Sequence, residues 1–361
     1  MENKRVWVFK LCWLVLGVVI LLLPFMFVAS TKPAPAPLPK VNWNYHSIMP
    51  KGHLLNKAAQ EAFDKLAEFT GGRFTITLYP AGALGFKGSE IWDAIGKGLV
   101  PMGEMWSMHV AGKYPFCTVL ELPGLYDRTN IQLSERLIAE LWDDLTKPFW
   151  ADNLHALNLN VWPAGQGLSV NKPLNLAEPK AILKGLKIRV AGPPSAWTVE
   201  TLGGKPTYTD WGEIYLAAQR GVVDGIDIAP GATMIAMKFH EVVKMGVFRD
   251  SKNYVPFEVA AASYFVVANK KEFEALPIDW QRKLKDLMKE AQAFIIREQP
   301  KEASIGAKRC VVEFGLAPVE VPAETLAYIR AEGAKYTEKW KAKAGPLGEK
   351  LHNKALGVIR K

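Results

Sequence analysis

The stretch EIWDAIGKGLVPMG, residues 90–103, returns in altered form as EIYLAAQRGVVDGI at residues 213–226. Both segments share a Glu-Ile-aromatic start, an Ala two residues further on, and a later Gly-apolar-Val step. This pattern is typical of a helix that stops at a glycine and leads into a buried strand. Two amphipathic helices can share it by chance, and the alternative is that two similar α/β lobes each contain the same unit. Two lobes that face each other form a cleft, where small-molecule sites preferentially occur.

The surrounding segments also alternate between strand and helix patterns. Residues 41–48 and 73–80 have the period-two alternation of strands, and residues 53–72 between them carry apolar side chains on one helical face. This strand-helix-strand order predicts an α/β fold. Residues 278–306 are predicted to form one long helix that could pack across both lobes, with Pro300 as a kink or a break.

The composition is that of a globular protein. The 361 residues are 49% hydrophobic and 22% charged, with a formal net charge of +9, and this length allows two domains of ordinary size. Lysine and arginine are interspersed with aspartate and glutamate, and no block of five like charges occurs. We therefore expect no nucleic-acid partner, and we interpret the excess charge as solvated surface that modestly favours anionic small ligands.

The N-terminus has the features of an export signal. Basic residues at the start of the chain precede an uninterrupted apolar run at residues 11–28. We predict a signal peptide at residues 1–30, cleaved after Ser30, and a Pro-rich linker at residues 31–40. The run is somewhat longer than a usual signal core, so an uncleaved membrane anchor is the alternative. Both interpretations place the rest of the chain in the periplasm.

The sequence lacks the motifs of the common enzyme classes. It contains no GxSxG, HExxH, GxGxxG or Walker-type loop, and its six histidines are scattered without zinc-ligand spacing. We therefore expect no cofactor and no metal. Asp224 and Asp227 could be the acid and base of a secreted enzyme, although an aspartate before a glycine at a strand end is more often a turn cap. A binding protein is the better interpretation.

An arginine stands in the middle of the short strand pattern GLKIRV, residues 185–190. Alternation places three apolar residues on one face of the strand, and Lys187 and Arg189 on the other. One interpretation is a sheet edge whose polar face meets water. The other is that the strand ends at a cleft, where the planar guanidinium binds an anion.

Five segments in this order and spacing resemble the solute-binding proteins of tripartite ATP-independent periplasmic (TRAP) transporters, the DctP-like family. The resemblance runs from about Val41 to the C-terminal helices, and it is carried by LYPAGALG, EIWDAIGKGLVPMG, VLELPGLY, KGLKIRV and EIYLAAQRGVVDG. It implies a two-lobed α/β fold with a hinge, crossing strands and a long helix spanning both lobes. It also implies an organic acid as ligand, integral membrane permease subunits as partners, and Arg189 as the residue that pairs with the ligand carboxylate. A guanidinium can bind a carboxylate through two parallel hydrogen bonds.

The lobes expected from the resemblance are each formed by separate parts of the chain. Residues 41–165 with about 256–290 are assigned to the first lobe. Residues 166–255 with about 291–361 are assigned to the second lobe.

Two departures from the sialic-acid and C4-dicarboxylate branches of the family narrow the expected ligand. Gln166 stands where those branches often carry a second arginine, and IDIAPGA at residues 226–232 replaces a Gln-Glu-Asn-Pro run. With one arginine, the expected ligand is a monocarboxylate. Some branches place an acid after this glycine to hold a cation, so Asp227 is a further candidate metal ligand.

Other cleft residues are expected where strands end. Several tryptophans near one arginine suggest a ligand with an apolar or aromatic body. A sensory protein that reports the same ligand to a membrane receptor would have the same pattern, so sensing stays an alternative to transport. The expected ligand-binding residues are Arg189, Gln166, Trp106, Trp211, His46, Ser47, Asp227 and Trp162.

Overall fold

A computed structural model describes the chain from residue 38 to residue 361, apart from the side chains of residues 163–165. The predicted signal peptide or anchor at residues 1–30, and the predicted linker as far as residue 37, lie outside the described residues. Within the described range, no helix combines the length and the apolar character needed to cross a membrane. Lys40–Lys361 form a single unit that contains both sheets of the fold.

The first sheet has five strands and combines parallel with antiparallel pairing. Its strands are β1 (Val41–His46), β2 (Phe74–Tyr79), β3 (Met102–Trp106), β4 (Leu154–Gly167) and β11 (Glu258–Asn269). They lie in the order β2-β1-β3-β11-β4, with β1 parallel to β2 and β3 and with β11 antiparallel to β3 and β4. The strands predicted around residues 41–48 and 73–80 are confirmed as β1 and β2.

Helices cover both faces of this sheet. They are α2 (Leu54–Phe69), α3 (Ile91–Gly96), α4 (Ser107–Val110), α5 (Ile131–Thr146) and α9 (Lys270–Glu274), with the 3-10 helices η2 (Pro115–Glu121) and η3 (Lys147–Asp152). Alternation along β11 explains the two faces, because Tyr264 and Val266 belong to one hydrophobic cluster and Phe265 and Val267 to another. The first cluster contains the apolar stripe of α2, and the second contains that of α5.

The second sheet has seven strands. They are β5 (Ser169–Val170), β6 (Lys187–Val190), β7 (Lys205–Tyr208), β8 (Gly225–Ile226), β9 (Met245–Asp250), β10 (Val255–Pro256) and β12 (Ala317–Glu320). Their order is β10-β9-β5-β8-β6-β7, and β12 pairs with β9. Because β6 lies between β7 and β8, the GLKIRV segment is not a sheet edge.

Short helices connect the strands of the second sheet. They are α6 (Pro193–Thr201), α7 (Ile214–Gln219) and α8 (Ala232–Ala236), with the 3-10 helices η4 (Pro179–Ala181), η5 (Trp211–Glu213) and η6 (Phe239–Glu241). Their apolar side chains complete clusters on this sheet, in which Ile188 and Val190 of β6 and Ile226 of β8 are buried. The strand alternation in GLKIRV therefore predicts the core-facing side of β6 correctly.

The two similar sequence segments fold in the same way, one in each sheet. α3 leads through Gly98 into β3, and α7 leads through Gly221 into β8; the two glycines have φ values of +75° and +69°. The amides after each helix make matching bonds, because Leu99 N donates to Ala94 O and Val222 N donates to Ala217 O, each over 2.9 Å. The prediction of one helix-to-strand unit in each lobe is confirmed.

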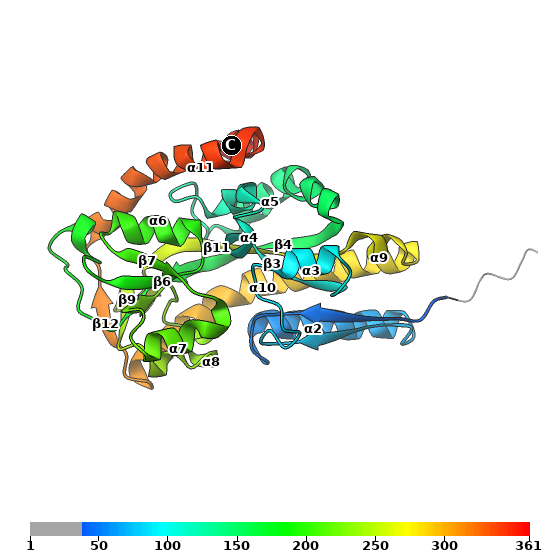
Figure 1. Cartoon of the computed structure of the whole chain (residues 1–361), viewed down its shortest axis with the longest axis horizontal. Helices are drawn as coiled ribbons and strands as arrows, with labels where there is room; N and C mark the ends of the chain where they lie inside the picture. Colours follow the sequence, from blue (N-terminus) through cyan, green and yellow to red (C-terminus); the bar gives the residue numbers. More distant parts are fainter. Residues whose placement is uncertain (1–37) are drawn as a thin grey trace, which may run out of the picture. The chain divides into compact units, whose positions relative to one another are not determined.

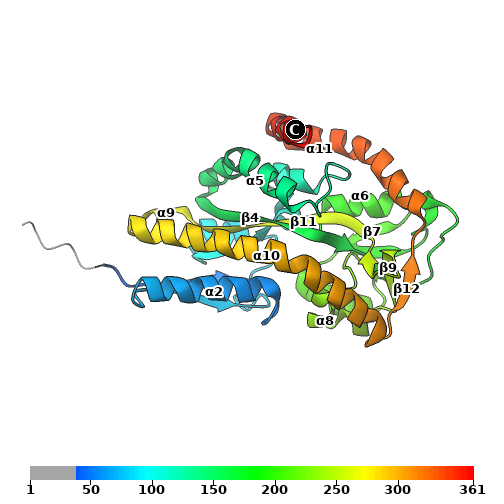
Figure 2. The same cartoon turned by 180° about the vertical axis from the view of Figure 1, so that it is seen from behind.

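One long helix connects the two halves of the molecule, which are the first sheet with its helices and the second sheet with its helices. α10 (Ile278–Val312) packs against α2 and β4 beside the first sheet and against α8 beside the second (Figures 1 and 2). The predicted helix across both lobes is therefore present. It continues through Pro300 without a break, contrary to one of the two alternatives for that residue.

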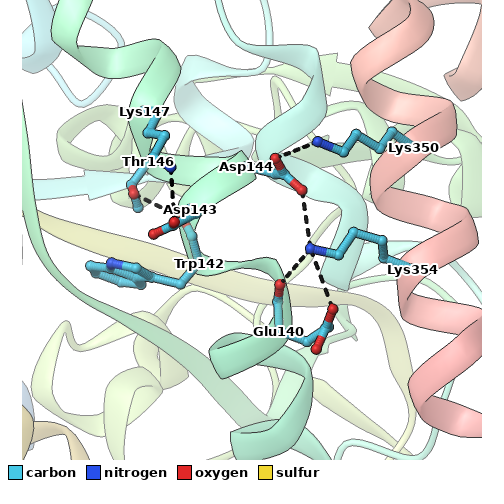
Figure 3. Close-up of polar contacts among 8 residues, drawn as sticks. All are labelled: Glu140, Trp142, Asp143, Asp144, Thr146, Lys147, Lys350 and Lys354. Atoms are coloured by element: carbon cyan, nitrogen blue, oxygen red, sulfur yellow. Dashed lines mark hydrogen bonds and ion pairs between the residues drawn. The ribbon is translucent and has the colours of Figure 1, made fainter.

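The last helix, α11 (Ala323–Ile359), also contacts both halves. It packs against α5 and η2 as well as α6, and it bends at Gly345, whose φ is +66°. Figure 3 shows how α11 is held to α5: Lys350 Nζ lies 2.7 Å from Asp144 Oδ1, and Lys354 Nζ lies 3.1 Å from Asp144 Oδ2. Residues 291–361 were assigned to the second lobe alone. That assignment stays a prediction, and α11 contacts elements of both halves.

Candidate functional site

A cavity of about 100 Å³ lies between elements of the two sheets. One group of lining residues comes from the end of β3 and from the segments that follow β1 and β3, and includes Met49, Trp106 and Met108. Another group consists of residues 227–233, which follow β8. The long helix α10 adds Glu302. The volume is several times the minimum that one water molecule needs, so the cavity can hold a small organic ligand.

The structure brings five of the eight predicted ligand-binding residues together at this cavity. Trp162 and Gln166 reach it from β4, where they pair with Ala262 and Ala260 of β11. Two others come from strand ends, as expected: Trp106 is at the end of β3 and Asp227 directly follows β8. The fifth, Trp211, is at the start of η5, which leads into the helix α7 of the repeated segment.

Arg189 lies directly behind the cavity wall. It is 1% exposed, and its Nη1 lies 2.7 Å from Oδ1 of Asp227, a side chain that lines the cavity. Nε of Arg189 donates to the carbonyl of Thr209 over 3.1 Å. These bonds use two of the five N–H donors of a guanidinium, so others remain for a ligand carboxylate. The interpretation of Arg189 as a solvated surface residue is wrong.

The sheet topology explains why Arg189 and Asp227 meet. β6 and β8 are parallel neighbours with Arg189 opposite Ile226, so Asp227 follows at the shared carboxyl edge. The second oxygen of Asp227 accepts the backbone N–H of Ala191 over 2.7 Å. Both carboxylate oxygens are thus bonded within the chain, and in the described residues no cluster of three or more metal-ligating side chains surrounds them.

Aromatic rings form much of the cavity wall. Trp106 packs on Tyr264 with ring centroids 4.7 Å apart, and Trp162 is stacked on His53 at 5.9 Å. The Trp211 ring lies 6.0 Å from Cζ of Arg189. Its buried Nε1 has no hydrogen-bond partner among residues 38–361, so this donor is available to a ligand in the cavity.

Two histidines at the cavity are neutral at physiological pH. Burial lowers the pKa of His53 to about 4, and burial together with the charge of Arg189 lowers that of His109 to about 4. His53 Nδ1 accepts the amide of Leu55, so its Nε2 carries the proton and donates to Thr233 Oγ1 over 3.1 Å. A ligand therefore meets no positive charge from these rings.

His46 and Ser47 lie outside the lining of the cavity, in contrast with the five predicted residues that line it. His46 is fully buried, with its ring 6.4 Å from that of Phe86. Ser47 Oγ donates to Oε1 of Glu104 over 3.1 Å, and the amide of Ile48 donates to the same oxygen over 2.6 Å. Ser47 thus belongs to a buried network that holds the Ile48–Met49 wall of the cavity.

Contacts between the two halves of the fold enclose the cavity. Lys87 Nζ lies 2.7 Å from Asp210 Oδ2 at the surface, and His53 meets Thr233 inside. Gly192 lies so close to Met108 that a Cβ atom on the glycine would stand 2.8 Å from the Met108 carbonyl oxygen. The halves therefore touch closely at the first turn after β6.

Sequence analysis missed several residues of this wall. Met49, Met108, His109, Gln299 and Glu302 all line the cavity. Gln299 and Glu302 flank the middle of α10, where the helix crosses from one sheet to the other. The only signal near them was Pro300, which does not by itself reveal what the helix faces.

The comparison with known families decides the classification. The family model described as bacterial extracellular solute-binding protein, family 7 (DctP), matches residues 45–343. The chain belongs to this family. The resemblance to TRAP solute-binding proteins is thereby confirmed, and so is the two-lobed α/β fold with its crossing strands and long helix.

Individual relatives agree with this DctP-family assignment. A monocarboxylate 2-oxoacid-binding periplasmic protein from Nostoc is 28% identical over 55% of this chain. The match spans about half of that relative's length, 53%. The C4-dicarboxylate-binding periplasmic protein DctP of Rhodobacter capsulatus is 26% identical over 75% of this chain and 85% of its own. The solved structure of a Bordetella pertussis extracytoplasmic solute receptor that binds pyroglutamic acid superposes with a TM-score of 0.76 at 22% identity, over 89% of this chain and all, 100%, of that one.

Proposed function

We propose that the protein captures an organic acid with one carboxylate and an apolar or aromatic body in the periplasm and delivers it to the membrane subunits of a TRAP transporter. The observation that carries this proposal is the buried Arg189 behind a cavity that three tryptophans line. Relatives support the ligand class, since one is named for monocarboxylate 2-oxoacids and another binds pyroglutamic acid. A structural neighbour from Advenella mimigardefordensis, 19% identical with a TM-score of 0.76, binds galactonate.

The charges around the cavity favour one carboxylate over two. The described residues that line it include no lysine or arginine, whereas Asp227 and Glu302 are both present. Arg189 is thus the cationic side chain next to the cavity, and it is already paired with Asp227. A second ligand carboxylate would be buried without a partner, which costs several kcal/mol.

The alternative of a secreted enzyme with Asp224 and Asp227 as acid and base finds no support in the geometry. Asp224 Oδ1 lies 2.7 Å from Lys172 Nζ, and Oδ2 accepts the Lys187 amide over 2.9 Å. Asp224 does not line the cavity among the described residues, and Asp227 is engaged by Arg189 and Ala191. Each aspartate therefore has a structural role of its own.

Calorimetry with paired ligands tests the proposed ligand class. We expect 4-methyl-2-oxopentanoate and pyroglutamate to bind more tightly than 2-oxoglutarate, which adds a carboxylate at similar size. A thermal-shift screen gives a parallel measurement, since a ligand at 100 times its Kd adds about 2.7 kcal/mol to the free energy of unfolding. Tighter binding of 2-oxoglutarate, or no binding of any organic acid, would overturn the proposal. Uptake of the bound acid in cells with and without this protein separates transport from sensing.

A further inference from the structure

A second cavity lies apart from the first. Its volume is about 450 Å³, and within the described chain none of its lining residues is shared with the first cavity. The loop after η2, the strands β9 and β11, and the helices α6 and α11 all contribute to its wall. Because both sheets take part, this cavity depends on the same relative placement of the two halves as the first cavity does.

Ionisable side chains form the polar part of this second cavity. Burial raises the pKa of Glu121 to about 8, which keeps its carboxyl group mostly protonated at neutral pH. Burial also raises the pKa of Glu258 above its usual value, so the positive charge of the three guanidinium groups exceeds the negative charge of the carboxylates around them. The arginines are Arg128, Arg249 and Arg330, and the carboxyl groups are those of Glu121, Asp127 and Glu258.

Arg128 and Glu121 both carry buried polar atoms that nothing in residues 38–361 satisfies. Nε and Nη1 of Arg128 are buried without a hydrogen-bond partner there, and its Nη2 lies 3.7 Å from Oε2 of Glu258, which is beyond hydrogen-bond distance. Oε1 of Glu121 accepts the amide and the hydroxyl of Ser263 over 2.9 and 2.8 Å, and its buried Oε2 has no partner in that range. Such donors fit an oxyanion.

Another part of the wall is apolar. Val259 of β11 and Leu326 and Ile329 of α11 line the cavity beside the arginines, and Val259 and Ile329 are themselves buried. A small inorganic anion would leave this part of the wall without a contact. A ligand with an anionic end and an apolar end uses both parts.

We propose that this second cavity binds a small monocarboxylate whose carboxylate pairs with Arg128 and whose apolar group lies against Val259, Leu326 and Ile329. Among the described arginines of the wall, only Arg128 carries buried donors without a partner, so the cavity offers a buried partner to one carboxylate. Protonated Glu121 donates a further hydrogen bond to the carboxylate. The proposal stands independently of the ligand of the first cavity, because the two cavities share no described lining residue.

Fluorine NMR with para-fluorobenzoate as the probe tests this proposal on the full chain. The uncharged para-fluorobenzamide is the control for the carboxylate. We expect Arg128→Gln to weaken one binding event about tenfold or more, as expected for a charged hydrogen bond. Arg282→Gln, which removes an exposed arginine of α10 paired with Asp279, is the matched control and should leave binding unchanged.

A second measurement needs no substitution. In methyl-labelled parent protein, the resonances of Ile329 and Leu326 should shift with para-fluorobenzoate and stay in place with para-fluorobenzamide. If the amide shifts them equally, or if neither compound does, the second cavity is not a carboxylate site. Unchanged probe binding by folded Arg128→Gln would overturn the proposal as well.

Discussion

Arg189 and Asp227 form a buried ion pair across neighbouring parallel strands, with 2.7 Å between Nη1 and Oδ1. The two residues are 1% exposed each, so neither charge is solvated by bulk water. A buried guanidinium that is already neutralised can be kept in the apolar surroundings of the cavity without a ligand. A ligand carboxylate then adds to a preformed pair instead of meeting an isolated charge.

Replacing Arg189 by Ala should therefore affect both stability and binding. Leaving Asp227 buried without its partner lowers the free energy of unfolding by about 3–5 kcal/mol. Any folded fraction should bind the organic acid about two to three orders of magnitude more weakly. Urea denaturation and calorimetry measure the two effects.

Lys187→Ala is the internal control for Arg189→Ala, because Lys187 lies two residues away on the same strand with an exposed side chain. It should change either quantity by no more than about 0.5 kcal/mol. Replacing both Arg189 and Asp227 by Leu should cost less stability than the sum of the single changes. Strict additivity in this cycle would show that the ion pair is not coupled.

Glu104 should make stability depend on pH. Burial raises its pKa from 4.5 to about 7, so the folded chain disfavours the ionised carboxylate. The stability that the protonated form contributes is fully present below pH 4.5 and is lost as the pH rises to about 7. The free energy of unfolding should be measured for the parent protein and for Glu104→Gln at each pH. The parent should lose about 3 kcal/mol relative to Glu104→Gln as the pH rises through this window.

The neighbouring titratable groups do not obscure this measurement. Tyr45 and Tyr264 face Glu104, and burial raises the pKa of both phenols well above 10.0, so they stay neutral throughout. Glu68→Gln, on the exposed side of α2, is the control for replacing a glutamate by glutamine. A flat difference between parent and Glu104→Gln from pH 4 to pH 8 would contradict a raised pKa.

Trp211 should contribute to affinity through its ring. Trp211→Ala removes an aromatic wall of the first cavity, and loss of about 1.5–3 kcal/mol of apolar contact weakens binding about tenfold to a hundredfold. Trp211→Phe keeps part of the wall and should lose less. Trp150→Ala, which removes a tryptophan that is 47% exposed, is the control in the same calorimetric assay. Equal affinities for all three variants would exclude a role for the ring.

Asp144 should hold the end of α11 only weakly. Its carboxylate bonds to Lys350 and Lys354 (Figure 3), and the hydrogen bonds to these lysines hold its pKa below the usual 3.8. Because both lysines are partly exposed, Asp144→Ala should lower the free energy of unfolding by about 1 kcal/mol or less. The effect should shrink at high salt, and persistence of a larger loss there would indicate packing instead of charge.

Local sequence patterns predicted the elements of the fold and some of the site. The period-two alternation of β1, β2 and β6 depends only on neighbours in sequence, as does the helix-to-strand step at Gly98 and Gly221. The interior position of β6 in its sheet cannot be predicted from neighbours in sequence, because it depends on pairing with β7 and β8. The strand pattern alone therefore could not predict whether Arg189 is exposed or buried.

The partner of Arg189 shows the same limit at the site itself. Asp227 was interpreted as a possible base or cation ligand, since nothing near it in sequence identifies a residue 38 positions away as its partner. Glu302 comes from still farther along the chain, on the middle of α10. Ser47 was misplaced for the opposite reason: it does follow a strand, but its hydroxyl turns to Glu104.

The close approach of Gly192 to Met108 makes the packing of the two halves sensitive to a single methyl group. A Cβ at residue 192 would stand 2.7 Å from that of Met108, so Gly192→Ala acts as a wedge between the halves while leaving the extended backbone at this residue free of strain. We expect such a variant to stay folded and to keep its aromatic wall, with the two halves held apart at this contact. If the protein delivers its ligand to a TRAP transporter as proposed, mixing this variant with the membrane subunits would tell whether docking recognises the close packing of the two halves or the ligand between them.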